Sequence, residues 1–237
     1  MKRTATRRRP AAPGTGWMER EARAVLREAG RSLARLERVA ARAVAEAAET
    51  VVAALESGGT VYFCGNGGSA ADAQHLAAEL AGRYFTERPA IAAVALTTNS
   101  SALTAIGNDY GFAQVFARQL EGLGTPGDVL VAITTSGGSA NVTAAIETAH
   151  RLGMTVIGLT GLKGRAFAAL CDIALVTPSD STPRIQEGHI AMGHALCELV
   201  ECAMFPAASA PAKGRGRRVR RARTAGAKGR RSGGRRR

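Results

Sequence analysis

The spacing of hydrophobic positions divides the chain into two kinds of segment. Over residues 17–57, aliphatic side chains recur near helical spacing, and Arg and Glu fill the opposite face. This pattern predicts amphipathic helix, with a break near Gly30 that separates a short helix from a long one. The apolar stripe is expected either to cover the chain's own domain or to pack against another subunit.

From Ser57 onward the pattern changes to short strands that alternate with helices. The predicted strands are aliphatic and continuous, as strands buried on both faces should be, and span residues 60–64, 91–96, 128–134, 154–160 and 172–177. Helices are predicted over residues 69–82, 111–122, 139–152 and 183–204. The alternation indicates an α/β fold, a three-layer αβα sandwich around a five-stranded parallel sheet. Ligands of such sheets bind at the carboxyl ends of the strands.

A glycine-rich turn, Gly65–Ser69, follows the first of these strands and opens a helix. Its spacing fits the relaxed form of a dinucleotide fingerprint, but the acidic residue expected ~20 positions later, at the end of the next strand, is missing. The turn is therefore predicted to bind a monophosphate through its backbone N–H groups, with Ser69 as the N-cap of the helix. The same helix places His75 and Glu79 one turn apart on one face, as a pair of metal ligands or acid/base groups.

A second polar turn, Thr134–Ser139, follows another buried strand and opens the next helix. Its hydroxyl groups, loose glycines and helix N-terminus make an anion site that needs no Lys or Arg. One turn of this kind is commonly only a turn. Two of them at strand ends of one sheet favour a functional role over an incidental turn.

Two further polar segments are candidates for the same site. Asn108 and Asp109 lie between Gly107 and Gly111, and local sequence alone favours an ordinary loop there. Gln186, His189 and His194 interrupt an otherwise apolar helix. Gln186 and His194 are N/O ligands of the kind that a zinc-class ion accepts, as are His75 and Glu79. However, Gln186 and His194 are ~12 Å and ~80° apart on a straight helix, so both must reach far or the ligands must come from different subunits.

The net charge of +13 is confined to the ends of the chain. Residues 212–237 carry 13 Lys/Arg and residues 1–10 carry five, which leaves residues 11–211 with 14 basic and 19 acidic side chains. The division expected from this is a basic disordered N-terminus (1–16), N-terminal helices (17–57), an α/β domain (58–206) and a disordered basic tail (207–237). The tail is expected either to be a solvated extension or to touch nucleic acid non-specifically.

Other compositional features restrict the class of protein. No apolar run approaches the ~20 residues of a membrane span, and no apolar h-region follows the basic N-terminus, so the cytoplasm is the expected compartment. The four cysteines show no C-x-x-C spacing, which favours free thiols over disulfides or a cysteine-based zinc site.

Together, the motifs Cys-Gly-Asn-Gly-Gly-Ser, His-x-x-x-Glu, Gly-Asn-Asp, Thr-Ser-Gly-x-Ser-x-Asn and Arg-Ile-Gln-Glu-x-His resemble the sugar-isomerase (SIS) domain family, and within it the phosphoheptose isomerases. The resemblance covers roughly residues 17–206. It implies a homotetramer with one zinc ion per subunit that interconverts sedoheptulose 7-phosphate and D-glycero-D-manno-heptose 7-phosphate.

By position, the resemblance also assigns roles to residues. Glu79 would be the base and His194 the acid of proton transfer through an enediol(ate). The metal ligands would be His75, Glu79, Gln186 and His194. The substrate-binding residues would be Asn66, Gly67, Gly68, Ser69, Glu79, Asn108, Asp109, Thr134, Thr135, Ser136, Ser139 and Gln186.

Two other functions compete with the isomerase. A relative in this family is a tetrameric scaffold that binds the replication initiator DnaA, and the ending Cys197–Pro206 and Glu87-Arg-Pro are similar to it. A scaffold has no chemical need to combine four such groups, so the enzyme is favoured; the four are His75, Glu79, Gln186 and His194. A protein tethered to nucleic acid by its tail is the third reading, and the acidic body offers no groove to support it.

Overall fold

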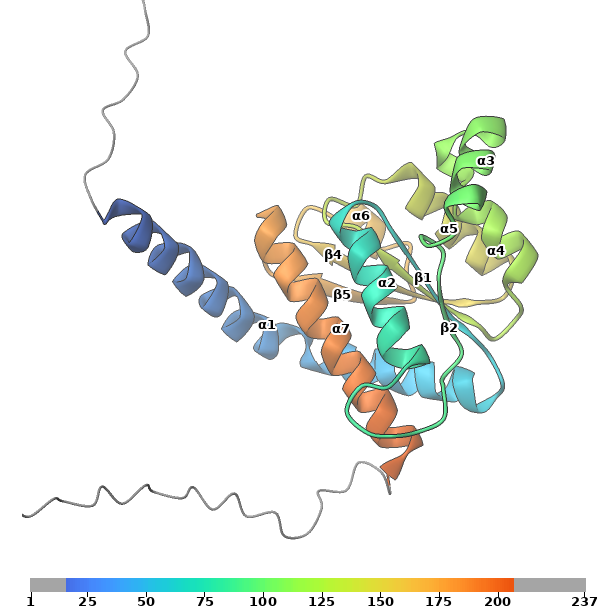
Figure 1. Ribbon diagram of the computed structural model, residues 1–237, viewed down its shortest axis with the longest axis horizontal. Helices are drawn as coiled ribbons and strands as arrows, with labels where there is room; N and C mark the ends of the chain where they lie inside the picture. Colours follow the sequence, from blue (N-terminus) through green and yellow to red (C-terminus); the bar gives the residue numbers. More distant parts are fainter. Residues whose placement is uncertain (1–15, 207–237) are drawn as a thin grey trace, which may run out of the picture.

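The computed structural model describes residues 16–206, so that residues 1–15 and 207–237, with the predicted basic disordered ends, lie outside it. The described part alternates helices and strands along the chain (Figure 1). In order, its elements are α1 (Trp17–Glu56), β1 (Val61–Gly65), α2 (Gly68–Ala81), β2 (Ala93–Ala95), α3 (Ser100–Tyr110), η1 (Phe112–Gln114), α4 (Ala117–Leu123), β3 (Val129–Ile133), α5 (Ala140–Arg151), β4 (Thr155–Gly161), α6 (Arg165–Ala168), β5 (Ile173–Thr177) and α7 (Thr182–Met204).

The five strands form one parallel sheet in the order β2-β1-β3-β4-β5. Every residue of β1 and β3 is buried, which agrees with the continuous apolar runs of their sequences. At the edge, β2 is only three residues long, shorter than the strand predicted over 91–96. The predicted α/β fold with a five-stranded parallel sheet is confirmed.

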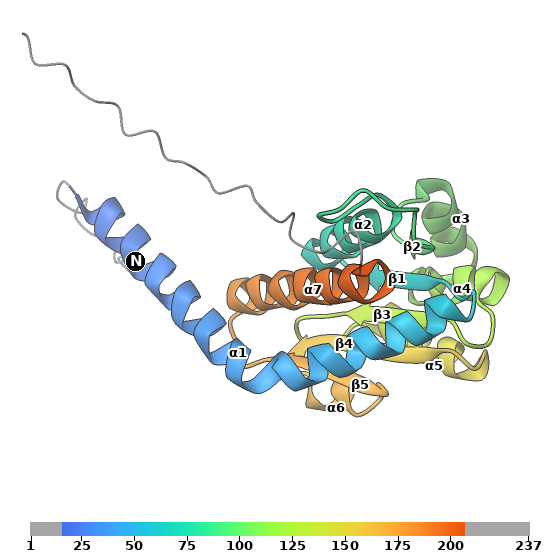
Figure 2. The same ribbon diagram turned by 90° about the horizontal axis from the view of Figure 1, so that it is seen from below.

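Helices cover both faces of the sheet, which completes the three layers (Figure 2). On one face, α1, α2 and α7 pack over alternate strand residues such as Phe63 and Val131. On the other face, α4, α5 and α6 pack over the residues between them, such as Cys64 and Leu130. The period of two along each strand divides the apolar side chains between these two cores.

The predicted break near Gly30 is absent, because α1 is one continuous helix of 40 residues. A glycine in a helix costs only ~1 kcal/mol relative to alanine, and the neighbouring Ala, Arg and Leu residues are strong helix formers. The buried positions of α1 begin at Ser32, Arg184 of α7 donates a hydrogen bond to the backbone oxygen of Val25 at 2.8 Å, and the N-terminal end of the helix extends away from the body (Figures 1 and 2). That segment exposes Trp17, Met18, Val25 and Leu26.

The segment between β2 and β3 also differs from its prediction. Asn99 caps α3 by accepting a hydrogen bond from the backbone N–H of Ala102 at 3.0 Å, and the helix runs through the predicted loop to Tyr110. Gly111, with a φ of 86°, ends α3. In place of one helix over 111–122 there is a short 3₁₀ turn followed by α4.

The order of the strands places two loops side by side. In the order β2-β1-β3-β4-β5, β2 lies on one side of β1 and β3 lies on the other. The strand order therefore reverses between β1 and β3, and ligands of open parallel sheets bind at such a point. Gly65 pairs with Ile133 at the ends of these strands, so the loops that begin at Asn66 and Thr134 leave the sheet together.

Between residues 16 and 206, no helix has the length and apolarity that crossing a membrane requires.

Candidate functional site

The first turn is so compact that a side chain at Gly65 would collide with the backbone of Ser69. Gly67, with a φ of 55°, is the N-cap of α2, and the helix begins at Gly68. Ser69 was predicted as the N-cap, but it lies within the first turn of the helix and is buried. The glycines form the tight turn, and Ser69 is left among the residues that line the cavity next to it.

The two predicted turns share one cavity. It has a volume of about 110 Å³ and is lined by Asn66, Ser69, Ile133, Thr134, Thr135, Ser136 and Ser139. The hydroxyl oxygens of Thr134 and Ser139 lie 3.2 Å apart, and Ser139 is the N-cap of α5. No Lys or Arg lines this cavity, and the N-termini of α2 and α5 both adjoin it. Hydroxyl groups, backbone N–H groups and helix dipoles make it suitable for an anion.

A pair of asparagines joins the two turns, and sequence reasoning assigned no role to one of them. Asn66 and Asn141 exchange two amide hydrogen bonds, each 2.8 Å long, between the loop after β1 and the first turn of α5. Asn141 is buried. Its signal in the sequence is the last position of Thr-Ser-Gly-x-Ser-x-Asn, where an asparagine in a helix is unfavourable unless its amide has a partner.

His75, Glu79 and His194 form the second half of the site. One ligand atom from each lies within 4.8 Å of the others, and α2 supplies two of the residues while α7 supplies the third. The Nε2 atoms of His75 and His194 are 2.8 Å apart, and Glu79 Oε1 is 3.4 Å from Nε2 of His75. Two imidazole nitrogens and one carboxylate oxygen that converge in this way match the donors of a zinc-class ion. The described residues therefore hold a group that fits a metal ion.

Asp72, one turn before His75 on α2, adds a partly buried carboxylate to this region. Burial raises the pKa of Asp72 above its ordinary value of 3.8, and the charges of His75 and His194 lower it by less. The Oδ2 atom of Asp72 has no hydrogen-bond partner among residues 16–206. Sequence reasoning missed Asp72 because an acidic residue on a helix is usually solvated.

Gln186 does not lie among these three residues but at the other end of α2. A side chain at Gly68 would collide with the Gln186 amide, so the two residues are in direct contact. Gly193 and Leu76 are in similarly close contact further along the same two helices. The helices α2 and α7 thus run side by side in the same direction, with Gln186 beside the glycine turn and His194 beside His75. Gln186 and His194, which are eight residues apart on α7, therefore lie at two different positions along its interface with α2.

Asn108 and Asp109 are exposed in the last turn of α3 and bond to each other at 2.8 Å. Neither lines the cavity between the two turns. The structure brings Asn66, Ser69 and the second turn together, brings His75, Glu79 and His194 together, and leaves Asn108 and Asp109 apart from both sets.

Comparison with known proteins gives a consistent assignment. The SIS domain family model matches residues 26–161. The phosphoheptose isomerase of Rhodospirillum rubrum is 58% identical over 187 residues, which cover 79% of this chain and 99% of that protein. A phosphoheptose isomerase of Bradyrhizobium is 60% identical over 158 residues, which cover 67% of this chain and 80% of that protein.

Solved structures agree with the sequence relatives. Phosphoheptose isomerase from Neisseria gonorrhoeae superposes with a TM-score of 0.74 at 46% identity, over 78% of this chain and 98% of that chain. The enzyme from Francisella tularensis gives a TM-score of 0.75 at 40% identity, over 77% of this chain and 97% of that chain. These relatives give no support to the scaffold that binds DnaA. The chain belongs to the phosphoheptose isomerase family of SIS-domain proteins and is an isomerase.

Proposed function

We propose that this isomerase converts sedoheptulose 7-phosphate to D-glycero-D-manno-heptose 7-phosphate through an enediol(ate), and that it depends on zinc. The observation that carries the proposal is the position of two chemically different groups along α2. An anion cavity adjoins the start of the helix, and the His75–Glu79–His194 group lies about two turns further on. Six residues separate Ser69 from His75, or ~9 Å along the helix. A seven-carbon sugar held by its terminal phosphate has the length to bring C1 and C2 to that group.

The proposed reaction moves one proton between C1 and C2. Glu79 is the base that removes the proton from one carbon and returns it to the other, and His194 is the acid that exchanges a proton with the oxygen atoms. Glu79 is partly buried, and Glu79 and His194 extend from different helices toward one point, so they can address two atoms of one substrate. Thr134, Thr135, Ser136 and Ser139 hold the phosphate, which fixes the register of the sugar relative to the proton-transfer pair.

The remaining sugar contacts are proposed from position. Asn66 and Ser69 line the cavity, Gly67 and Gly68 lie between them in the chain, and Gln186 lies against Gly68. Asn108 and Asp109 are proposed to contact the sugar from the end of α3. Because they are exposed and bonded only to each other, this requires either a movement of α3 or a substrate that extends toward it.

Zinc, one ion per subunit, is proposed to bind His75, Glu79, Gln186 and His194. When bound, such an ion supplies a positive charge that polarises the carbonyl and hydroxyl oxygens of the substrate. The convergent nitrogens of His75 and His194 support the first part of the ligand set. Gln186 would complete it either by reaching along α7 or from a neighbouring subunit.

A homotetramer is proposed on the basis of the exposed apolar face of α1. The face continues into a groove of about 380 Å³ between α1 and α7, lined by residues such as Leu33, Leu36, Met192 and Leu199. An exposed apolar helix face that continues into an apolar groove is typical of subunit contacts. The compartment is proposed to be the cytoplasm, in agreement with four free cysteines.

The test is an isomerase assay of the purified full-length protein before and after treatment with a chelator. We expect conversion of sedoheptulose 7-phosphate, loss of that activity as zinc is removed, and recovery when zinc is returned. Sedoheptulose without phosphate is the matched control substrate and should be converted poorly. Undiminished activity in protein shown to be free of metal would exclude the zinc requirement, and inactivity of the zinc-loaded protein would exclude the substrate.

A further inference from the structure

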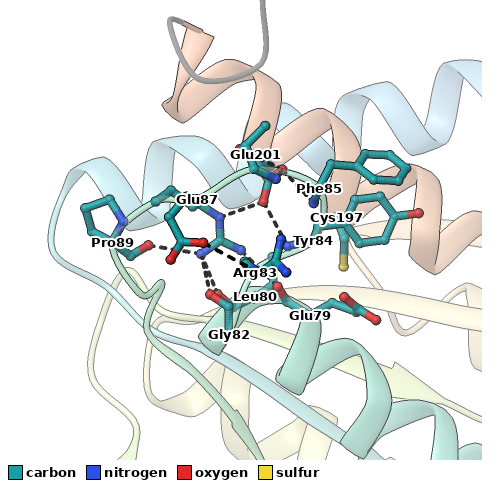
Figure 3. A network of polar contacts seen from close by, with 12 residues as sticks. Glu79, Leu80, Gly82, Arg83, Tyr84, Phe85, Glu87, Pro89, Cys197 and Glu201 are labelled. Carbon is teal, nitrogen blue, oxygen red and sulfur yellow. Dashed lines mark hydrogen bonds and ion pairs between the residues drawn. The ribbon is translucent and has the colours of Figure 1, made fainter. Parts of the chain in front are cut away.

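A buried carboxylate on α7 holds the loop that follows α2. Glu201 accepts hydrogen bonds from the backbone N–H groups of Tyr84, Phe85 and Thr86, each at 2.9 Å (Figure 3). It also accepts one from the Thr86 hydroxyl at 3.0 Å and one from Arg88 Nε at 2.8 Å. Burial alone raises the pKa of Glu201. The hydrogen bonds from Phe85, Tyr84, Arg88 and Thr86 together outweigh burial and lower the pKa to about 2. The carboxylate is therefore charged and bonded on both oxygens.

Its partner, Arg88, binds the end of α2. The side chains of Arg88 and Glu201 are 0% and 2% exposed, so the pair is shielded from water. Arg88 donates to the backbone oxygens of Glu79 at 2.9 Å, Leu80 at 2.9 Å and Gly82 at 3.2 Å. The last turn of α2 contains no basic residue of its own. Arg88 thus supplies the positive charge and the donors that the carbonyl end of this helix needs.

The two contacts connect the two helices that carry the metal-fitting group. His194 and Glu201 are seven residues apart on α7, two turns along the same face. The loop held by Glu201 also positions Tyr84, whose ring centroid lies 5.9 Å from that of His194. At the level of the group, Leu76, next to His75, packs directly on Gly193, next to His194. The spacing of His194 relative to Glu79 therefore depends on how the ends of α2 and α7 are held together.

We propose that Arg88 and Glu201 are positioning residues, a buried clamp that sets the distance between His194 on α7 and the His75–Glu79 pair on α2. The inference rests on the proposed metal-binding and isomerase function. The clamp contacts neither the phosphate cavity nor any residue that lines it. Its loss should therefore affect metal binding and proton transfer and leave phosphate binding intact.

The experiment compares three variants of the full-length protein. Glu201→Gln keeps the size of the side chain but turns an amide N–H₂ toward groups that are all donors. Thr86→Val removes one of the five donors to Glu201 without a change in shape. Leu120→Ala, in the core on the other face of the sheet, is the matched control for a general loss of stability.

For each protein we would measure the zinc dissociation constant by competition with a chromogenic chelator, the Ki of inorganic phosphate, kcat and the melting temperature. We expect Glu201→Gln to bind zinc at least ~10-fold more weakly and Thr86→Val to change in the same direction by less. The kcat should fall in parallel, with the Ki of phosphate unchanged. Leu120→Ala should lower the melting temperature and keep the zinc affinity.

The outcomes separate the clamp from the proposed function. Wild-type zinc affinity in both Glu201→Gln and Thr86→Val, or an equal loss in Leu120→Ala, would overturn the clamp. If Glu201→Gln does not fold, the zinc affinity of Thr86→Val compared with that of Leu120→Ala decides in the same way. A wild-type protein that binds zinc but does not isomerise the sugar overturns the function, while the zinc affinities still decide the clamp. A wild-type protein that binds no zinc overturns both.

Discussion

Asn66 and Asn141 exchange two amide hydrogen bonds of 2.8 Å across the point where β1 and β3 end. Each side chain satisfies the donor and the acceptor of the other. Because Asn66 leaves β1 and Asn141 opens α5, the pair fixes the glycine turn relative to the hydroxyl-rich turn. The pair therefore joins the two turns that line the cavity.

We therefore expect Asn141→Ala to weaken phosphate binding. The substitution leaves the Asn66 amide without its partner in a partly buried position, which costs ~1–3 kcal/mol. The KM of the sugar phosphate and the Ki of inorganic phosphate should both rise ~10-fold, with zinc affinity unchanged. Asn99→Ala, which removes an exposed helix cap, is the control. Unchanged phosphate affinity in Asn141→Ala would show that the pair does not shape the cavity.

Gly68→Ala should reduce activity with little loss of stability. The new Cβ would collide with the end of the Gln186 side chain, which is flexible enough to move aside. A displaced Gln186 can no longer contribute to the sugar or metal site. In Gly122→Ala, by contrast, the Cβ would meet no atom within 4 Å. We expect kcat/KM to fall ~10-fold or more in Gly68→Ala alone, while urea unfolding gives similar stability for both variants. Equal kinetics in the two variants would remove Gln186 from the site.

Glu79→Gln and His194→Gln should each reduce kcat by ~100-fold or more, since general acid–base catalysis contributes on this scale. Both variants should keep the oligomeric state of the wild type, measured by light scattering. The control is His150→Gln, because His150 pairs with Asp172 at 3.2 Å on the surface and lies on α5. Full turnover in either Glu79→Gln or His194→Gln would remove that residue from the proton-transfer step.

The parts of the site that the sequence predicts well are those set by local pattern. Continuous apolar strands followed by Gly65–Ser69 and Thr134–Ser139 predict both turns, and the i, i+4 spacing predicts that His75 and Glu79 share a face. The strand order is not local, so the cavity that joins the turns, and the Asn66–Asn141 pair within it, need the structure. Ser69 is displaced from the cap position because Gly67 can adopt a positive φ.

Elements whose residues have mixed preferences could not be predicted from pattern. Gly107, Asn108 and Asp109 are poor helix formers, yet α3 contains them because its cap at Asn99 and its packing against the core outweigh propensity. The same applies to α1, where a long amphipathic pattern outweighs Gly30. Glu201 gave no signal as a buried residue, since an acidic residue near a helix end is normally exposed and its partner Arg88 is more than a hundred residues away.

The buried His189 should make the protein less stable as the pH falls from about 6.5 to about 4. Burial lowers the pKa of His189 from 6.5 to about 4, and a backbone contact at Thr160 offsets part of this. Below pH 6.5 the unfolded chain binds a proton that the folded chain does not, so stability declines until His189 itself is protonated. The expected loss is about 3 kcal/mol.

His189→Leu should remove this part of the pH dependence. The readout is the difference in unfolding free energy between pH 7 and pH 4.5, measured in chelator so that metal release does not contribute. A change in packing alone would shift both values equally, whereas the loss of titration makes the decline in the variant smaller. An identical decline in wild type and variant would mean that His189 does not titrate in this range.

Deletion of residues 212–237 should leave kcat and KM unchanged, because all the proposed site residues lie between Asn66 and His194. These last residues carry 13 Lys/Arg, and a non-specific contact with nucleic acid, one of the two expectations for the tail, would depend on them. If the tail contacts nucleic acid, the full chain should bind single-stranded RNA or DNA more weakly as salt rises, as expected when Lys and Arg displace counterions from phosphates. The truncated chain should lose that binding. A truncated protein with impaired turnover would instead give the tail a part in catalysis or assembly, and retained binding would place the nucleic-acid contact on residues before 212.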